Sequence, residues 1–381
     1  CALPILKKKV LSVLLCTTMM GGMLLGCGGD SGNASDTKET DAVAKSESGS
    51  DSSKKKDADD LITVGFSQVG AESDWRTANS ESMKDTFTEA NGFELIFDDA
   101  QQKQDNQITA IRNFIQQEVD YILLAPVTET GWDTVLQEAQ DADIPVIIVD
   151  RMVDVSDDSL YTTWIGTDSL MEGRKAAEWL NAYSEANAID AKDLNIVDIQ
   201  GTIGSTAQIG RSKGLEEGVE KYEWNLLEQQ TGEFTQAKGQ EVMESLLKQH
   251  DDINVVYCEN DNEAFGAIDA IESAGKKVGG DIKNGEIMII SFDTTKAGLT
   301  DTLEGKISCD VECNPLHGPR AQELIEKMED GEEVEKLNYV DEEIFTQDDS
   351  VKTVTTKNSL DEENEYKVTK LTQEILDERA Y

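Results

Sequence analysis

Short apolar runs alternate with amphipathic segments along the chain from residue 61 onward. The apolar runs predict strands at 61–66, 93–97, 121–125, 145–149, 160–165, 194–199, 226–230, 253–257, 286–291 and 307–311. The intervening segments have helical periodicity, as in 104–118, where Ile108, Ile111 and Ile115 fall on one face, and in 130–142. Such alternation is typical of parallel βαβ units with helices on both faces of a sheet. The ten predicted strands are too many for one small sheet, so we expect an α/β fold of two Rossmann-like lobes.

Residues 1–60 do not continue this pattern. Lys7, Lys8 and Lys9 precede an apolar run over 10–25, which is typical of a signal peptide. Leu24-Leu25-Gly26-Cys27 is similar to the lipobox of bacterial lipoproteins, in which the cysteine becomes lipidated. We therefore expect a signal peptide over 1–26, and a lipidated Cys27 with a disordered tether over 27–60. The alternative is a transmembrane anchor, for which a run of about 16 residues is short.

Composition and charge exclude several functions. The chain has 381 residues, enough for two domains, and its 34 Lys and Arg against 77 Asp and Glu give a formal charge of -43. The electric field of so negative a protein repels the phosphate backbone of nucleic acids, so we expect no nucleic-acid partner. The glycines of 201–205 lack the spacing of a P-loop.

Cysteine and histidine are too sparse for a disulfide framework, a zinc site or a hydrolytic triad. We expect Cys258, Cys309 and Cys313 to be unpaired structural thiols, and His250 and His317 to lie at the surface. The sequence therefore predicts no enzyme activity, no metal and no cofactor.

Polar side chains recur where the predicted strands end. Glu72, Trp75 and Arg76 follow the first strand, Asp150 and Arg151 follow the fourth, and the later strands are followed by Arg211, Asn260 and Asp293. The carboxyl ends of parallel strands form the edge at which open α/β sheets bind ligands. Charged planar groups bond hydroxyls and an aromatic ring covers apolar C–H groups, so this mixture suits a neutral polyhydroxyl ligand.

Structural explanations of the same residues remain open. Ser73 or Asp74 could cap a helix whose Trp75 lies in the core, and Asp150 with Arg151 could form a surface ion pair. The segment 160–168 is the best candidate for a crossing between lobes. There we expect Asp168 to cap the following helix rather than to bind ligand.

At this point the chain resembles the periplasmic sugar-binding proteins of ABC importers (type I, ribose-binding-like), and among them the galactofuranose-binding proteins. The motifs that carry the resemblance are VGFSQVGAESDWR (64–76), DAQQKQDNQ (99–107), APVTETGW (125–132), IPVIIVDR (144–151), QGTIG (200–204), RSKG (211–214), TGEFTQAKGQEVM (231–243) and residues 266–275. The chain departs from those proteins at Asn260-Asp261-Asn262, at Phe292 and Thr294, and at Gly210, where an Asp is usual.

The resemblance implies a two-lobed clamshell that closes on one monosaccharide and then docks on an ABC permease. It implies a first lobe of 61–166 with 312–340 and a second lobe of 167–311 with 341–381. The implied ligand contacts are Glu72, Trp75, Arg76, Asp150, Arg151, Arg211, Asn260 and Asp293. Trp75 would pack on the ring, the arginines would donate and the carboxylates would accept. Glu312 follows a strand at a return crossing, as hinge or as ligand contact.

We therefore expect a monomeric receptor for a galactofuranose-like or galactose-like sugar. A lipid on Cys27 would tether it to the outer face of the cell membrane, or in the periplasm. The alternatives are a binder of another pentose or hexose, and a sugar sensor that feeds a membrane kinase or chemoreceptor.

Overall fold

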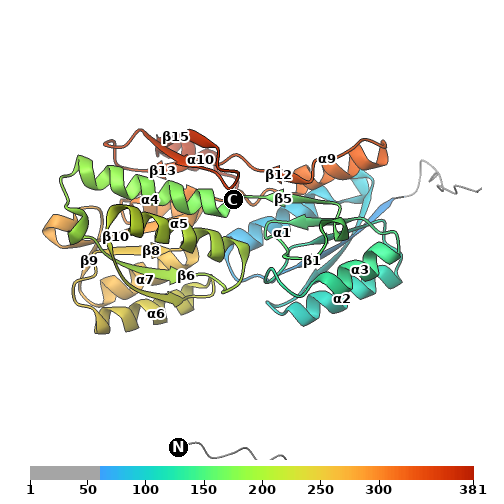
Figure 1. Cartoon of the computed structure of the whole chain (residues 1–381), viewed down its shortest axis with the longest axis horizontal. Helices are drawn as coiled ribbons and strands as arrows, with labels where there is room; N and C mark the ends of the chain where they lie inside the picture. The colour runs from blue at the N-terminus through green and yellow to red at the C-terminus, as the bar shows by residue number, and fades with distance from the viewer. Residues whose placement is uncertain (1–60) are drawn as a thin grey trace, which may run out of the picture. The chain divides into compact units, whose positions relative to one another are not determined.

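Two sheets with helices on both faces make up the computed structural model, which describes residues 61–381 (Figure 1). The signal peptide, the lipidated Cys27 and the tether predicted from the sequence lie outside these described residues. Within them, no helix combines the length and the apolar character needed to cross a bilayer. The predicted α/β fold with two parallel-stranded lobes is confirmed.

The first lobe contains a six-stranded sheet in the order β12-β5-β4-β3-β1-β2, with all neighbours parallel. Its strands are β1 (Ile62–Gln68), β2 (Phe93–Asp99), β3 (Tyr121–Leu124), β4 (Val146–Val149), β5 (Thr163–Gly166) and β12 (Leu337–Tyr339). Its helices are α1 (Asp74–Thr86), α2 (Gln104–Gln116), α3 (Asp133–Asp141) and α9 (Gly318–Glu329). Short 3-10 turns η1 (Glu89–Asn91) and η2 (Asp158–Leu160) complete it.

The second lobe contains strands in the order β14-β15-β13-β11-β10-β8-β6-β7, with β9 beside β10. Its strands are β6 (Asn195–Gln200), β7 (Asn225–Thr231), β8 (Val255–Cys258), β9 (Lys277–Val278), β10 (Glu286–Asp293), β11 (Cys309–Glu312), β13 (Ile344–Thr346), β14 (Thr353–Lys357) and β15 (Glu363–Lys370). Its helices are α4 (Ser169–Ala186), α5 (Thr206–Tyr222), α6 (Gln236–Gln249), α7 (Asp261–Ser273), α8 (Lys296–Leu303) and α10 (Gln373–Glu378), with 3-10 turns η3 (Ala191–Asp193) and η4 (Ile282–Asn284).

Both faces of each sheet are buried, which explains why the central strands are continuous apolar runs. In β4, Ile147 packs with α1 and α9 on one face, while Ile148 packs with α2 and α3 on the other. In the second lobe, α4 and α5 cover one face and α6 and α7 the other. This arrangement directs the carboxyl ends of β1, β4, β6, β8 and β10 toward the gap between the lobes.

The chain passes between the two sheets three times. The crossings follow β5, β11 and β12, near Thr167, Cys313 and Glu342 respectively. Asp168 caps α4 as expected, because its carboxylate accepts from the backbone N–H of Met171 at 3.0 Å. The finer limits given for each lobe in the sequence analysis stay a prediction.

Helices α4 and α5 approach each other through glycine. A Cβ added at Gly214 would lie 2.4 Å from the carbonyl carbon of Gly173, and one at Gly210 would lie 2.6 Å from the amide nitrogen of Leu170. Only hydrogen fits at these positions. The close approach brings Glu172 of α4 against Arg211 of α5, where they form an ion pair.

We predict that Gly214→Ala lowers the free energy of unfolding by about 1–3 kcal/mol, because the added methyl forces α4 and α5 apart. Denaturant unfolding followed by circular dichroism measures this loss. The matched control is Lys213→Ala on the exposed face of the same helix turn, which should change stability little. Equal stability of the two variants would contradict the close contact.

Candidate functional site

A small pocket lies between the lobes at the carboxyl ends of their strands. It contains about 290 Å³ of space not filled by atoms, part of it open to solvent, compared with 640 to 980 Å³ for the cavities elsewhere on the second lobe and beside the crossings. Its walls are formed by Glu72, Ser73, Trp75, Arg76, Asp150, Arg151, Ala207, Arg211, Phe234, Asn260, Asp293 and Cys313. Converging charged groups, rather than size, distinguish it from the larger cavities.

Direct contacts between the lobes enclose this pocket. The backbone N–H of Asp74 donates to Asn262 Oδ1 at 2.9 Å. On another side, Thr206 Oγ1 accepts from the N–H of Met152 and donates to Glu129 Oε1, both at 2.7 Å. The two lobes therefore already touch through their own side chains in this closed arrangement.

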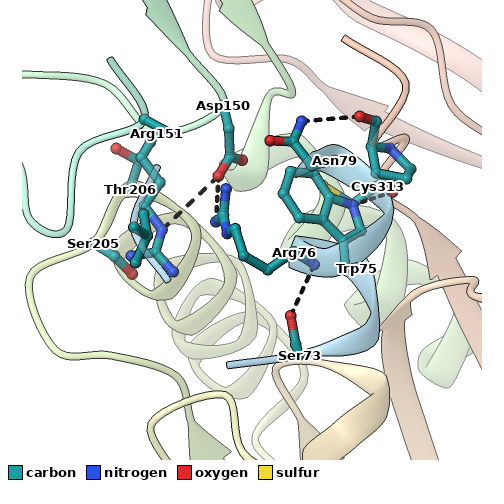
Figure 2. A network of polar contacts seen from close by, with 12 residues as sticks. Ser73, Trp75, Arg76, Asn79, Asp150, Arg151, Ser205, Thr206 and Cys313 are labelled. Atoms are coloured by element: carbon teal, nitrogen blue, oxygen red, sulfur yellow. Dashed lines mark hydrogen bonds and ion pairs between the residues drawn. The ribbon is translucent and has the colours of Figure 1, made fainter. Parts of the chain in front are cut away.

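Arg76 is the centre of the charges from the first lobe. Its Nη2 lies 2.6 Å from Asp150 Oδ2 (Figure 2). Its Nε lies 3.1 Å from Glu72 Oε1. Burial opposes the charge of Arg76, but Asp150 and Glu72 outweigh it and raise its pKa. Burial also opposes ionisation of Asp150, yet the charges of Arg76 and Arg151 lower its pKa. These groups therefore stay charged inside the protein.

Arg151 is less fully compensated. Burial and then the charge of Arg76 lower its pKa to about 10. Its Nη1 donates to the carbonyl of Val127 at 2.9 Å, and its Nη2 lies 3.6 Å from Glu72 Oε1. Its guanidinium also lies 5.3 Å from the ring centre of Phe234, which crosses from the second lobe.

The second lobe contributes Arg211. Its Nε donates to Glu172 Oε2 at 2.8 Å, its Nη1 donates to the carbonyl of Glu259, and its Nη2 lies 3.5 Å from Asp293 Oδ1. Burial opposes the charge of Arg211, but the charge of Glu172 outweighs it and raises its pKa. Burial raises the pKa of Asp293 well above its usual range.

Trp75 connects the pocket to a crossing between the lobes. Its Nε1 donates to the backbone carbonyl of Cys313 at 2.6 Å, and the Arg76 guanidinium lies 4.6 Å from its ring centre (Figure 2). The ring of His317 packs edge-on against it at 5.8 Å. The indole is thereby fixed in one orientation at the pocket wall.

Three residues of the pocket wall have left-handed backbone conformations. The φ angles are 64° at Asp150, 60° at Phe234 and 107° at Asp293. Each such conformation costs on the order of 1–3 kcal/mol in a residue other than glycine, and it persists only where the surroundings enforce it. Such strain is concentrated at functional sites, so it supports a ligand site here.

Two buried polar atoms of the pocket have no hydrogen-bond partner among the described residues. They are Glu72 Oε2, an acceptor, and Arg151 Nε, a donor. Buried polar atoms are almost always hydrogen-bonded in folded proteins. The pair therefore offers one free acceptor and one free donor to a small polar ligand.

Eight of the nine residues expected from the sequence line this one pocket: Glu72, Trp75, Arg76, Asp150, Arg151, Arg211, Asn260 and Asp293. The capping alternative also holds, because Ser73 caps α1 and Asn260 caps α7. A surface ion pair at Asp150 and Arg151 is wrong, since Arg151 is buried and Asp150 nearly so.

Glu312 is not among the residues that line the pocket. Its carboxylate accepts from Arg379 Nη1 at 2.6 Å, from the Tyr381 hydroxyl at 2.7 Å and from the N–H of Glu343 at 3.0 Å. Of the two roles that the sequence left open, this geometry favours the hinge over a ligand contact.

Phe234 and Cys313 line the pocket but were not predicted there. Phe234 does lie within the motif at 231–243 that supported the resemblance. An aromatic residue in an otherwise polar loop after a strand was the signal available. Cys313 lies on a crossing between the lobes, and the sequence offers no signal that it lines the pocket.

The surface position expected for His317 is wrong, because its side chain is fully buried. The turn that contains it begins α9, which packs so closely on α1 that a Cβ at Gly318 would lie 2.2 Å from the carbonyl oxygen of Ser82. Its Nδ1 lies 3.2 Å from Asn79 Nδ2.

His250 is partly exposed and its Nε2 lies 2.9 Å from Glu228. Cys258, Cys309 and Cys313 are buried and unpaired, as predicted.

One group of side chains has the composition of a metal site. The ligand atoms of Glu172, Cys313 and Glu342 lie within 4.8 Å of one another. Two cations already lie against them, since Arg211 pairs with Glu172, and Lys175 Nζ donates to the backbone carbonyl of Glu342 at 3.0 Å. These cations supply the positive charge that a metal ion would bring, so we assign no metal to this group.

We predict that His317 makes stability fall as the pH is lowered. Burial lowers its pKa from about 6.5 to about 4, so between these values only the unfolded chain binds the proton. The loss of unfolding free energy from pH 7 to pH 5 should therefore be about 2 kcal/mol smaller in His317→Gln than in the parent. Denaturant unfolding at both pH values measures this, with His250→Gln as the control. An unchanged pH dependence in His317→Gln would contradict a buried neutral imidazole.

Residues 64–317 match the model of the periplasmic binding protein domain. The match covers well over half of the chain, and the chain therefore belongs to this family. Its known relatives are binding proteins, which supports a role in binding rather than in catalysis.

Three individual proteins that this chain resembles have names that state a sugar ligand. The galactofuranose-binding protein YtfQ of Escherichia coli K12 is 41% identical over 292 residues, which are 75% of this chain and 88% of that protein. A Mycobacterium smegmatis structure in complex with β-D-fucofuranose superposes with a TM-score of 0.71 at 45% identity, covering 76% of this chain and 93% of that one. The binding protein of the arabinose ABC transporter of Shewanella sp. ANA-3, bound to α- and β-L-arabinofuranose, superposes with a TM-score of 0.70 at 43% identity over the same shares.

Proposed function

We propose that this protein captures a monosaccharide in its five-membered ring form, galactofuranose or a closely related sugar, and delivers it to an ABC permease. The observation that carries the proposal is the pocket between the lobes in which Glu72 Oε2 and Arg151 Nε are buried without a hydrogen-bond partner among the described residues. The relatives support the ring form, because the names of all three state a furanose ligand.

Charge balance in the pocket favours a neutral ligand. The guanidinium groups of Arg76, Arg151 and Arg211 face the carboxyl groups of Glu72, Asp150 and Asp293. A phosphate or carboxylate ligand would meet these acidic groups, whereas hydroxyl groups can donate to them. The same hydroxyl and ring oxygens can accept from the arginines. Trp75 offers the aromatic surface on which the C–H face of the ring would rest.

Both lobes contribute groups to the pocket, so ligand binding is linked to lobe closure. A sugar that bonds Arg151 of the first lobe and Arg211 of the second does so only when the lobes are closed. It therefore stabilises the closed form by the difference in its affinity for the two forms. The closed lobes would present the surface that the permease recognises.

The membrane tether is part of the same proposal. A lipid on Cys27 would hold the receptor at the outer face of the membrane beside its permease. Use of the same receptor by a membrane kinase or chemoreceptor remains the alternative role for the bound sugar.

We predict that isothermal titration calorimetry detects binding of galactose, fucose or arabinose, with glucose as the weakly bound control because it forms little furanose in solution. The carbon NMR spectrum of bound, ¹³C-labelled galactose should show a furanose anomeric carbon. Binding in the pyranose form would overturn the ring assignment, and absence of binding to every monosaccharide would overturn the proposed function.

We further predict that Arg151→Ala weakens sugar binding by about 1.5–3 kcal/mol, because it removes a charged hydrogen bond in a buried site. Titration calorimetry with the sugar that binds best measures the change. The matched control is Arg112→Ala, which removes an exposed arginine that pairs with Glu138 on the outer surface of the same lobe. If the two variants bind equally well, Arg151 is not a ligand contact.

A further inference from the structure

The pocket residue Asp293 lies in a strained part of the second lobe. Its φ of 107° is followed by a φ of 53° at Thr294, so two consecutive residues other than glycine are left-handed. Together they cost several kcal/mol on the usual scale of such strain. Something in the fold must hold the segment Asp293-Thr294-Thr295, here called the acceptor loop, in this shape.

Two buried carboxyl groups hold the acceptor loop. Asp261, the first residue of α7, accepts from the Thr295 N–H at 2.8 Å and from the Thr295 hydroxyl at 2.7 Å. Asp310 of β11 accepts from the Thr294 N–H at 3.2 Å. Because the loop lies between them, removing either carboxyl group frees a backbone N–H at a strained residue.

These two carboxyl groups also meet each other. The register of β10 and β11 places Ser291 opposite Asp310, and the Ser291 hydroxyl donates to Asp261 Oδ1 at 2.7 Å. The Asp310 side chain lies close enough to Asp261 to act on its pKa, and both side chains are fully buried. Asp310 Oδ2 has no hydrogen-bond partner among the described residues.

Among the described residues, the cations near this pair are already engaged with other carboxylates. The charged groups that act on the pair are Asp293 on the pocket side and Arg379 from the segment after α10. Arg379 is engaged with Glu312, and Arg211 with Glu172. The charge of Asp261 adds to the effect of burial in raising the pKa of the Cys258 thiol in β8, and the Thr294 side chain opposes the rise that burial causes in the pKa of the Tyr381 hydroxyl. Two ionised carboxylates in contact without a cation repel each other strongly.

We propose that Asp310 carries a proton that it donates to Asp261, and that this pair positions the acceptor loop so that Asp293 faces the ligand pocket. A proton on Asp310 Oδ2 gives this orphaned oxygen a partner and leaves the rest of both carboxyl groups free to accept from the loop. Asp261 and Asp310 are therefore positioning residues, and Asp293 is the group that touches ligand. This inference rests on the proposed function, since its main readout is sugar binding.

A pH dependence follows from the shared proton. Burial raises the pKa of Asp261 to about 6 and that of Asp310 well above its usual range. As the pH rises, the pair loses its shared proton and the two carboxylates repel each other. The acceptor loop then relaxes, which displaces Asp293 and its contact with Arg211. Sugar affinity should consequently fall on the alkaline side.

The test compares sugar affinity by titration calorimetry from about pH 6 to pH 9 in the parent, Asp310→Ala and Asp310→Asn. Asp310→Ala leaves the Thr294 N–H unpaired and should weaken binding about tenfold or more at pH 6. Asp310→Asn imitates the protonated acid, because its carbonyl can accept from Thr294 and its NH₂ can donate to Asp261. It should bind as the parent does at pH 6 and lose the alkaline fall in affinity.

The matched control is Asp198→Asn, which neutralises another buried carboxyl group of the same sheet that contacts Gln229 and not the acceptor loop. It should keep the affinity and pH profile of the parent. Parent-like affinity in Asp310→Ala, or equal pH profiles in the parent and Asp310→Asn, would overturn the inference.

An infrared measurement needs no sugar and separates this inference from the proposed function. The difference spectrum of the parent minus Asp310→Asn should contain the carbonyl band of a protonated carboxylic acid at neutral pH. A protein that binds no sugar but shows this band would refute the proposed function and retain the proton-sharing pair. Absence of the band refutes the pair, whatever the sugar data show.

Discussion

The buried pairing of guanidinium and carboxylate groups is the constraint on which the rest of this structure depends. Removing one charge from water costs several kcal/mol even after the protein relaxes, and the pocket places three arginines out of water. Arg76 is compensated by Asp150, and Arg211 by Glu172, each with an N–O distance below 3 Å. Arg151 has longer and fewer such contacts. The network is therefore incomplete at Arg151 and Glu72, where one donor and one acceptor have no hydrogen-bond partner among the described residues.

The fold is arranged to make this pairing possible. The glycines between α4 and α5 let Glu172 reach Arg211, and the left-handed residues turn Asp150 and Asp293 toward the gap between the lobes. The three crossings are themselves tied together, because Glu342 Oε1 accepts from the Thr167 hydroxyl at 2.6 Å and from the Asn314 N–H at 2.8 Å. Trp75 donates to the residue before Asn314. The pocket wall is therefore hydrogen-bonded directly to one of the crossings between the lobes.

The parts of the fold that the sequence predicted are those that follow from local pattern. Strands such as β3, β4 and β8 are buried on both faces and therefore apolar throughout. The prediction missed β12, β14 and β15, whose residues are largely exposed. It also missed the two-residue β9 and the three-residue β13, although β13 is buried, because such short segments show no clear pattern. Residue 160 was assigned to a strand because it is apolar, but it belongs to η2.

The candidate site likewise divides into residues that local pattern could place and residues that it could not. Charged residues directly after strands could be placed at one edge because parallel sheets align their carboxyl ends. The ion-pair partners of these residues could not be placed from the sequence, because Glu172 lies 39 residues from Arg211 and Arg379 lies 67 residues from Glu312. Glu312 and His317 were ambiguous or wrong for this reason: their environment is made by α10 and α1, which the local sequence does not contain. Contacts of this range depend on how helices pack, which hydrophobic periodicity alone does not specify.

Burial gives the two lobes opposite responses to acid. In the first lobe, His317 is held neutral, so protonation opposes folding as the pH falls. In the second lobe, burial raises the pKa of Asp198 to about 7 and that of Asp261 to about 6, and these groups bind protons more tightly in the folded chain than in the unfolded one. Their contribution is present in full below the unfolded pKa of about 4 and is lost as the pH rises through these folded values. The formal charge of -43 counts every carboxyl group as ionised, whereas burial raises the pKa of several carboxyl groups in the second lobe.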